Sequence, residues 1–365
     1  MRIVIAGNLA NNGYFLTKLL RNEGISANLL LKKNPIITED PKSIDHFKEY
    51  PEWIEFWDGS KFNWKYQIIK KMRQYDLVHA STELPIFAYL SRKPFVAFTT
   101  GADIAKLANE KSIKGFLLRR AYKKAAVVVF AAPYQEKYVN RLKIKKSLYI
   151  PILWDHTKFT SKYHNKINNE KFVIFHPTNH VWNYKKNDRF MRAFVRISKE
   201  YKNIHLILIN RGSDFEKSLD VIGKDILREK VTIIPETLSQ SQLIDYYHNS
   251  DLIVDQFGVG STGLIGQEVM ACEKPLLQYI DVDMYKKFYS ETPPILNAET
   301  ENEIYIAIQN VLNDPKLGIK IGKKSREWIL KYHDHKKIVQ KYIYLYKAIN
   351  EKESFNKIRE KIQLI

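Results

Sequence analysis

Cysteine is nearly missing from this sequence. Cys272 is the single cysteine among 365 residues, so no disulfide can form within the chain. Such usage is typical of a reducing compartment, and we expect a cytoplasmic protein. No run of about 18 apolar residues is present, which predicts no transmembrane helix. The apolar stretch 2–6 at the N-terminus is too short and too poorly flanked for a signal peptide and is predicted to be a strand.

Acidic residues are also scarce. The chain has 40 Asp and Glu against 59 Lys and Arg, which gives a formal net charge of +19. Three interpretations compete: a generally lysine-rich composition, attraction to an anionic membrane surface, and binding of nucleic acid. Zinc-finger spacing, an RNP motif and a compact basic arm are all missing, so nucleic acid is disfavoured as a partner. Asp281 and Asp283 have no histidine or third carboxylate nearby, and we expect no metal site there.

Short β-branched runs alternate with helical segments along the whole chain. Parallel strands buried on both faces read as such continuous apolar runs, and strand-helix alternation predicts a doubly wound α/β sheet. The length predicts two such domains. The expected strands are 2–6, 27–31, 76–80, 95–98 and 126–130 in the first half and 171–177, 205–209, 231–234, 252–254 and 275–279 in the second.

The two series define the expected domain organisation. The first Rossmann-like domain is predicted at 1–155 and the second at 170–330, joined by a polar linker, and a helical segment at 331–365 is expected to pack back. In open α/β sheets, ligands bind beyond the carboxyl ends of the strands. Two such sheets are therefore expected to face a central cleft that holds the ligand.

A glycine-rich loop follows the predicted strand 252–254. Residues 258–263 read Gly-Val-Gly-Ser-Thr-Gly, a literal G-x-G-x-x-G, and Asp281 follows the last glycine by 18 positions. This pattern alone would indicate a dinucleotide site. However, that fingerprint normally lies on the first strand-helix turn of its sheet, whereas about three strands precede this one. The position argues against NAD.

The same loop still suits an anion. Glycines let backbone N–H groups approach a diphosphate, and the N-terminus of the following helix adds partial positive charge. Glu268 follows in the first turns of that helix, where a carboxylate can accept hydrogen bonds from ribose hydroxyls. The alternative is a plain glycine turn followed by a solvated glutamate. The candidate anion-binding residues of the loop are Gly260, Ser261, Thr262 and Gly263.

At these residues the sequence resembles retaining glycosyltransferases of the GT-B fold, in the large family commonly called GT4. Segment 251–263 and the following Gln-Glu-Val-Met-Ala-Cys-Glu-Lys-Pro look like that family's donor signature. Glu268 matches the second of two family glutamates, which binds the nucleotide ribose. The first falls on Gly260, a departure that leaves the sugar contact open. Lys185 matches the family's phosphate-binding lysine, its arginine falls near Asn179, and Arg211 is expected to supply the missing charge.

Further motifs of the resemblance lie in the first half. Segment 99–103, Thr-Thr-Gly-Ala-Asp, looks like the family motif that faces the transferred sugar. Asp103 is therefore a candidate for holding the sugar or the attacking hydroxyl, with a helix N-cap as the alternative. His79 and His176 lie at strand ends, where a structural role is favoured. The other candidates for the acceptor side are Asn11, Asn12, Gly13 and Thr100.

The resemblance implies a glycosyltransferase that moves a sugar from a nucleotide-sugar donor to a glycan or lipid-linked acceptor, with retention and without a metal or other cofactor. Lys185, Arg211 and the loop amides would stabilise the departing diphosphate. The alternatives are a sugar-nucleotide epimerase of the same architecture and a non-enzymatic nucleotide-binding protein. Segments 61–73 and 114–124 mix aromatic and basic residues, and they are either a membrane-contacting surface or ordinary amphipathic helices.

Overall fold

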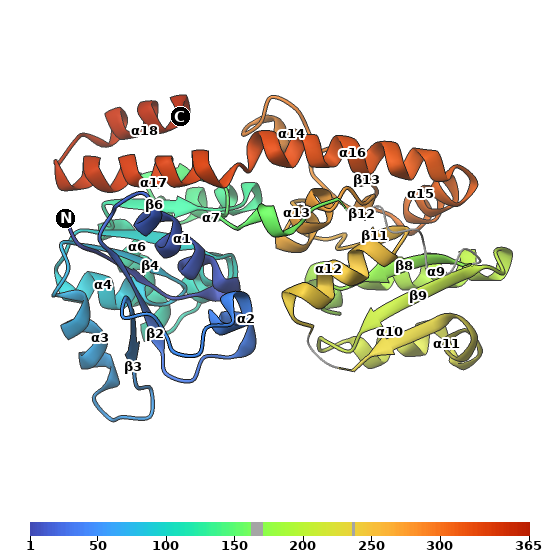
Figure 1. Ribbon diagram of the computed structural model, residues 1–365, viewed down its shortest axis with the longest axis horizontal. Helices are drawn as coiled ribbons and strands as arrows, with labels where there is room; N and C mark the ends of the chain where they lie inside the picture. Colours follow the sequence, from blue (N-terminus) through green and yellow to red (C-terminus); the bar gives the residue numbers. More distant parts are fainter. Residues whose placement is uncertain (162–170, 236–237) are drawn as a thin grey trace. The chain divides into compact units, whose positions relative to one another are not determined.

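The computed structural model describes residues 1–161, 171–235 and 238–365 (Figure 1). These residues form two compact units, Met1–Asp155 together with His333–Ile365, and His156–Tyr332. Residues 162–170 of the predicted linker lie outside the described residues. Among the described helices, none has both the length and the apolar character that crossing a bilayer requires.

The first unit is built on a parallel sheet. Its strands are β1 (Ile3–Ala6), β2 (Ala27–Lys32), β3 (Ile54–Trp57), β4 (Leu77–Ser81), β5 (Phe95–Thr99), β6 (Val127–Phe130) and β7 (Ser147–Tyr149). The strand order is β3-β2-β1-β4-β5-β6-β7, and every described pairing is parallel. Strands β1, β4, β5 and β6 are buried along their whole length, which explains their continuous apolar sequences.

Helices cover both faces of this sheet. The helical elements of the chain's first part are η1 (Leu9–Asn11), α1 (Asn12–Asn22), η2 (Ile37–Glu39), α2 (Lys42–Asp45), α3 (Trp64–Met72), α4 (Pro85–Ser91), α5 (Ala102–Ala105), η3 (Leu107–Asn109), α6 (Ile113–Lys124), η4 (Pro133–Gln135) and α7 (Glu136–Arg141). Helix α4 packs on β4 and β5 and contacts α3 and α6, so these three helices form one layer.

The C-terminal helices complete the first unit. Helices α17 (His335–Asn350) and α18 (Phe355–Leu364) are red in Figure 1; α17 lies beside α1, and α18 packs against α17. Ile338, Tyr342 and Leu345 of α17 belong to the same apolar cluster as β1, β2 and α1. The expectation that the C-terminal helix packs back is thus confirmed, and its place is on the core formed by the start of the chain.

The second unit repeats the architecture with a smaller sheet. Its strands are β8 (Phe172–His176), β9 (Ile204–Ile209), β10 (Val231–Ile234), β11 (Leu252–Val254), β12 (Leu276–Gln278) and β13 (Leu296–Asn297), in the order β10-β9-β8-β11-β12-β13. Its helical elements are η5 (His156–Lys158), α8 (Trp182–Lys185), α9 (Asn187–Glu200), α10 (Phe215–Ile222), α11 (Lys224–Lys230), α12 (Gln240–Asn249), α13 (Leu264–Ala271), α14 (Val282–Lys286), α15 (Glu301–Asn313) and α16 (Pro315–Tyr332).

Both sheets change direction at one point. The chain adds strands outward from β1 through β3, then returns to β4 on the other side of β1; the second sheet does the same at β8 and β11. The loops that leave the two strands at such a switch diverge to opposite faces, and a ligand can bind between them. The predicted class, two Rossmann-like doubly wound units, is confirmed.

Removing the Tyr346 hydroxyl tests whether the C-terminal helices belong to the first core. The hydroxyl lies 2.8 Å from Nδ1 of His79 on β4, and both side chains are buried. Burial lowers the pKa of His79 to about 3, so the ring is neutral and loses its partner in Tyr346→Phe. We expect the free energy of unfolding to fall by about 1–3 kcal/mol in urea denaturation. The matched change at exposed Tyr66 should have no effect, and equal stability of both variants would contradict this packing.

Candidate functional site

The candidate residues of the second unit gather at the carboxyl ends of β8 and β11. The loop after β8 leads to α8, which carries Lys185, and the loop after β11 leads to α13, which carries Glu268. His176 ties the two strands together, because its Nδ1 lies 2.9 Å from the carbonyl oxygen of Val254. Arg211 follows β9, and its carbonyl oxygen accepts the backbone N–H of His180 at 2.8 Å. The switch point of the sheet therefore collects residues far apart in the sequence.

Gln256 folds the glycine-rich loop. Its Oε1 accepts the backbone N–H groups of Gly258 and Val259 at 3.0 and 2.7 Å, and its Nε2 donates to the carbonyl oxygen of Ser261 at 2.8 Å. Gly260 has φ +72°, a left-handed conformation that favours glycine. The loop therefore turns around the side-chain amide of Gln256, which holds it by three hydrogen bonds.

The loop amides are not equally available to a ligand. The backbone N–H of Thr262 donates to the Tyr285 hydroxyl at 2.8 Å, and the Thr262 hydroxyl lies 2.7 Å from the same oxygen. Helix α13 begins after Gly263, and among the described residues no side chain caps this end. An anion at this site would therefore meet the helix N-terminus around Gly263 and not the Thr262 amide.

Lys185 lies against the start of the same loop. Its ammonium is 3.9 Å from Oδ1 of Asp255, and its carbonyl oxygen accepts the backbone N–H of Phe257 at 2.8 Å. The Lys185 side chain is 24% exposed, whereas the Asp255 side chain is 1% exposed. The positive end of this pair therefore faces outward, and the negative end lies inside the unit.

Arg211 reaches the position where the resemblance expects an arginine. Its Nε donates a hydrogen bond to Oδ1 of Asn179, in the loop after β8. The guanidinium thus lies beside Asn179 although it comes from the following strand. The structure brings together the neutral side chain at the expected position and the cation predicted to replace it.

Glu268 is buried and is held by a tyrosine from the neighbouring helix. Its Oε2 accepts the hydroxyl of Tyr247 on α12 at 2.9 Å, and the residue is 6% exposed. Burial raises the pKa of Glu268 to about 7; the Tyr247 hydrogen bond opposes this shift, and the charge of Asp255 adds to it. The carboxyl group therefore changes its charge close to neutral pH.

Two histidines beneath the loop after β8 are structural. His176 donates from Nδ1 to Val254, and its Nε2 accepts the Asn187 amide at 3.0 Å. His180 has its Nδ1 2.8 Å from the Ser218 hydroxyl, whose own proton goes to the carbonyl oxygen of Asp214. His180 must therefore donate from Nδ1. Burial lowers the pKa of His180 to about 4, and both rings are neutral supports of the loop.

In the first unit, the asparagine loop after β1 holds itself together. Asn8 donates to Oδ1 of Asn11 at 2.8 Å, and Asn12 donates to the carbonyl oxygen of Leu153 at 2.6 Å. All three asparagines are buried, and Gly13 follows them in the first turn of α1. Their amide hydrogen bonds join this loop to neighbouring segments of the same unit.

Asp103 has a similar internal role. Its Oδ1 accepts the backbone N–H groups of Thr100 and Gly101 at 3.0 and 2.8 Å, and its Oδ2 accepts the Tyr122 hydroxyl at 2.9 Å. Gly101, not Asp103, occupies the N-cap of α5. The carboxylate is buried, and burial raises its pKa. This geometry makes Asp103 a residue that positions Thr100, which lies at the carboxyl end of β5.

The acidic pair after β12 is part of a helix start. Asp281 accepts the backbone N–H of Met284 at 2.9 Å and thereby caps α14, while Asp283 points to solvent beside Lys286. Within the described residues, no group of three histidine, cysteine or acidic side chains could hold a metal ion.

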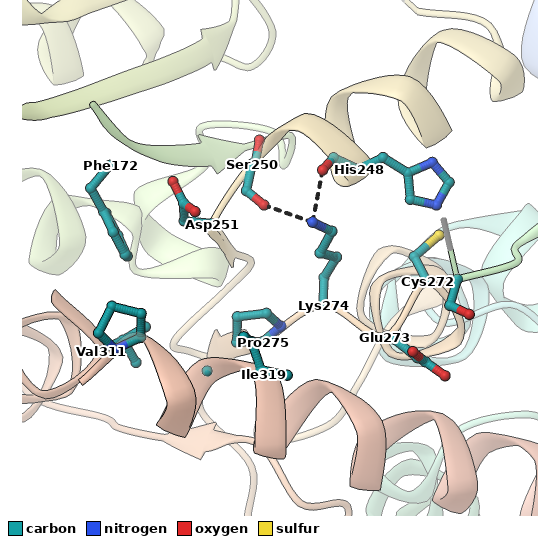
Figure 2. Close-up of a pocket in the computed structure, with 13 residues that line it drawn as sticks. Phe172, His248, Ser250, Asp251, Cys272, Glu273, Lys274, Pro275, Val311 and Ile319 are labelled. Carbon is teal, nitrogen blue, oxygen red and sulfur yellow. Dashed lines mark hydrogen bonds between the residues drawn. The ribbon is translucent and has the colours of Figure 1, made fainter. Parts of the chain in front are cut away.

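A cavity of about 310 Å³ lies at the opposite, amino edge of the second sheet (Figure 2). It is lined by the segments that enter β8, β11 and β12, including Phe172, Asp251 and Pro275. Lys274 does not point to a ligand there, because its ammonium donates to the carbonyl oxygens of His248 and Ser250 at 2.7 and 3.1 Å. These bonds satisfy the end of α12, where a cation is favourable. This cavity is thus separate from the candidate site at the carboxyl edge.

Three residues of the site were missed by the sequence analysis. Asp255 and Gln256 directly follow the buried strand β11. A polar pair at the carboxyl end of a strand indicates a site residue, so the sequence could have predicted both. Tyr247 gave no signal, since its contact with Glu268 depends on how α12 packs beside α13.

Glu268 is expected to titrate near pH 7, and Tyr247→Phe should raise its pKa further by removing a hydrogen bond to the charged form. The folded state binds this proton more tightly than the unfolded chain does. Stability conferred by the protonated group is therefore lost as pH rises from about 4.5 to about 7. Relative to Glu268→Gln, the wild type should lose on the order of 3 kcal/mol across this window in urea unfolding. Parallel pH profiles of the two proteins would contradict the assignment.

The chain is similar to known proteins in part of its sequence and in its fold. Residues 158–328 match the family described as Glycosyl transferases group 1. A search of curated proteins gives no match. A crystal structure of Anabaena Alr3699/HepE in complex with UDP and glucose is similar with a TM-score of 0.74 at 13% identity, over 95% of this chain and 100% of that chain.

Two further solved structures share the fold. Sucrose-phosphate synthase from Thermosynechococcus elongatus has a TM-score of 0.70 at 16% identity, over 96% of this chain and 99% of that chain. A glycosyltransferase from Rickettsia africae has a TM-score of 0.69 at 14% identity, over 97% and 99%. At these identities the likeness concerns the fold, which is GT-B. The sequence match to the glycosyl transferases group 1 family, over residues 158–328, lies almost wholly within the second unit.

Proposed function

We propose that the protein is a glycosyltransferase that transfers a sugar, with retention, from a nucleotide-sugar donor to a glycan or lipid-linked acceptor in cell-surface glycan synthesis. The observation that carries this proposal is the arrangement at the β8/β11 switch point. Lys185 lies against the start of the glycine loop, Arg211 lies at the loop after β8, and the glycine loop leads into the uncapped N-terminus of α13, which carries the buried carboxyl group of Glu268. The family match of the second unit and the UDP complex of a structural neighbour support a nucleotide sugar as the donor.

The cations fit the leaving group of such a reaction. When the bond between the sugar and the diphosphate breaks, negative charge grows on the departing oxygens. Lys185 and Arg211 would stabilise that charge, together with the N–H groups at the start of α13. Their two positive charges match the charge of a departing nucleoside diphosphate, and we propose a metal-independent reaction for this reason.

Glu268 would bind the nucleotide through its ribose. An ionised carboxylate accepts hydrogen bonds from hydroxyl groups, and Tyr247 holds one of the two oxygens of Glu268 in place. The Gly260 position carries no side chain, so the transferred sugar would contact backbone groups and small hydroxyls there. The resemblance that places a carboxylate at this position in other enzymes does not extend to this chain.

The first unit would bind the acceptor, and one of its surfaces suits an anionic membrane. Phe62, Tyr66, Ile113 and Phe116 are exposed around the beginnings of α3 and α6, two helices that flank α4 in one layer. Lysines 61, 65 and 114 are exposed among them. We call these seven residues the α3–α6 surface. Aromatic and aliphatic side chains interleaved with lysines favour contact with anionic headgroups.

Substitution of the two donor-site charges tests the nucleotide assignment. Lys185→Ala and Glu268→Ala should each weaken binding of UDP, or of whichever nucleotide diphosphate a thermal-shift screen selects, by about tenfold or more in calorimetry. Lys199→Ala and Glu216→Ala, at exposed positions of α9 and α10, are the matched controls. Wild-type affinity in both site variants would refute the assignment. Product analysis completes the test: sugar released equally with and without acceptor would indicate an epimerase or hydrolase instead.

The α3–α6 surface can be tested separately. The wild-type protein should float with liposomes that contain anionic lipid at low salt, and Phe62→Ser combined with Phe116→Ser should reduce the bound fraction several-fold, because apolar area and charge act together. Ile319→Ser, at an exposed position of α16, is the control. If wild-type protein stays unbound at low salt, this surface has another role.

A further inference from the structure

Asp255 stands where a buried charge is costly. It follows β11 directly, is 1% exposed, and its Oδ1 has no hydrogen-bond partner among the described residues. Burial of an ionised carboxylate costs several kcal/mol of lost hydration, which a nearby positive charge can offset. Burial of Asp255 therefore costs stability unless a cation lies beside it.

Lys185 provides the compensating charge. The 3.9 Å between its Nζ and Oδ1 of Asp255 is within ion-pair range but longer than a hydrogen bond. The pair thus attracts the ammonium toward the base of the site without using its N–H donors. The oxygens of an incoming diphosphate would accept hydrogen bonds from the Lys185 ammonium, while Asp255 lies beneath it.

The backbone reinforces this pairing. The N–H of Phe257 donates to the carbonyl oxygen of Lys185 at 2.8 Å, and the chain at Gly258 passes so close to Tyr184 that a Cβ there would lie 2.2 Å from the Tyr184 carbonyl oxygen. The segment that carries Lys185 and the segment that carries Asp255 are therefore fixed to each other by main chain as well as by charge.

We propose that Asp255 is a positioning residue of the nucleotide site, a buried anion that holds the Lys185 ammonium in place for the diphosphate. This inference rests on the proposed function and names a residue that acts through Lys185 and not by touching the substrate. Its burial fits that role, since a side chain 1% exposed beneath a partly exposed lysine is screened from a ligand.

The diphosphate dependence of binding distinguishes this role from a general structural one. Asp255→Asn keeps the shape but removes the charge. It should weaken UDP binding by at least about tenfold in calorimetry, because a misplaced phosphate contact is costly. The weaker affinity for uridine should not fall, because the variant removes a charge that opposes ionisation of Glu268. Asp251→Asn, at the amino end of the same strand, is the matched control for damage to β11.

The outcomes separate the two proposals. If wild-type protein binds no nucleotide, the proposed function is wrong. If wild-type protein binds UDP and Asp255→Asn binds it equally well, the positioning role alone is wrong. Equal losses for UDP and uridine would also overturn that role, because they would indicate a disturbed fold.

A double-mutant cycle measures the coupling between Lys185 and Asp255 without any ligand, with the Tm of thermal unfolding as the readout. Lys185→Met leaves Asp255 buried with no cation and should lower Tm in the wild-type background. The same change should lower Tm much less in the Asp255→Asn background, where no buried charge remains. Equal Tm shifts in both backgrounds would show that the two side chains are not coupled and would overturn the inference.

Discussion

The close attachment of the loop after β11 to the loop after β8 is the constraint on which the candidate site depends. A parallel sheet forces its connecting loops to the carboxyl edge, and the reversal of strand order makes two of them diverge there. The bond from His176 to Val254 joins the strands, and the bond from Phe257 to Lys185 joins the loops. Cations, glycine turn and helix N-terminus are held at one place because these two loops cannot move independently.

Charge is distributed in this site by depth. Lys185 and Arg211 lie toward the surface, whereas Asp255 and Glu268 are buried behind them. In the proposed site the two cations would bind the diphosphate, Asp255 would orient Lys185, and Glu268 would accept hydrogen bonds from the ribose. Because the charge of Asp255 raises the pKa of Glu268, the two buried acids are not independent either. An anionic ligand thus meets positive charge first, although the interior of the site is acidic.

The sequence predicted the central strands of both sheets and the edge strand β10 but missed β3, β7 and β13. All three are edge strands, where one side faces solvent and the apolar run that identifies a buried parallel strand is lost. Among candidate residues, the sequence found those that follow strands, since topology alone brings them together. It could not show which of these polar side chains also hold a loop in place, as Asp103 and Asn12 do.

We expect a nucleoside diphosphate to bind at the β8/β11 switch point of the second unit. The most direct measurement is a crystal structure of the protein soaked or grown with UDP. We expect electron density for the diphosphate beside the Lys185 ammonium and the start of α13, with the ribose next to Glu268. Density for UDP at the amino edge of the sheet, in the cavity beside Lys274, or anywhere else outside the switch point would contradict it.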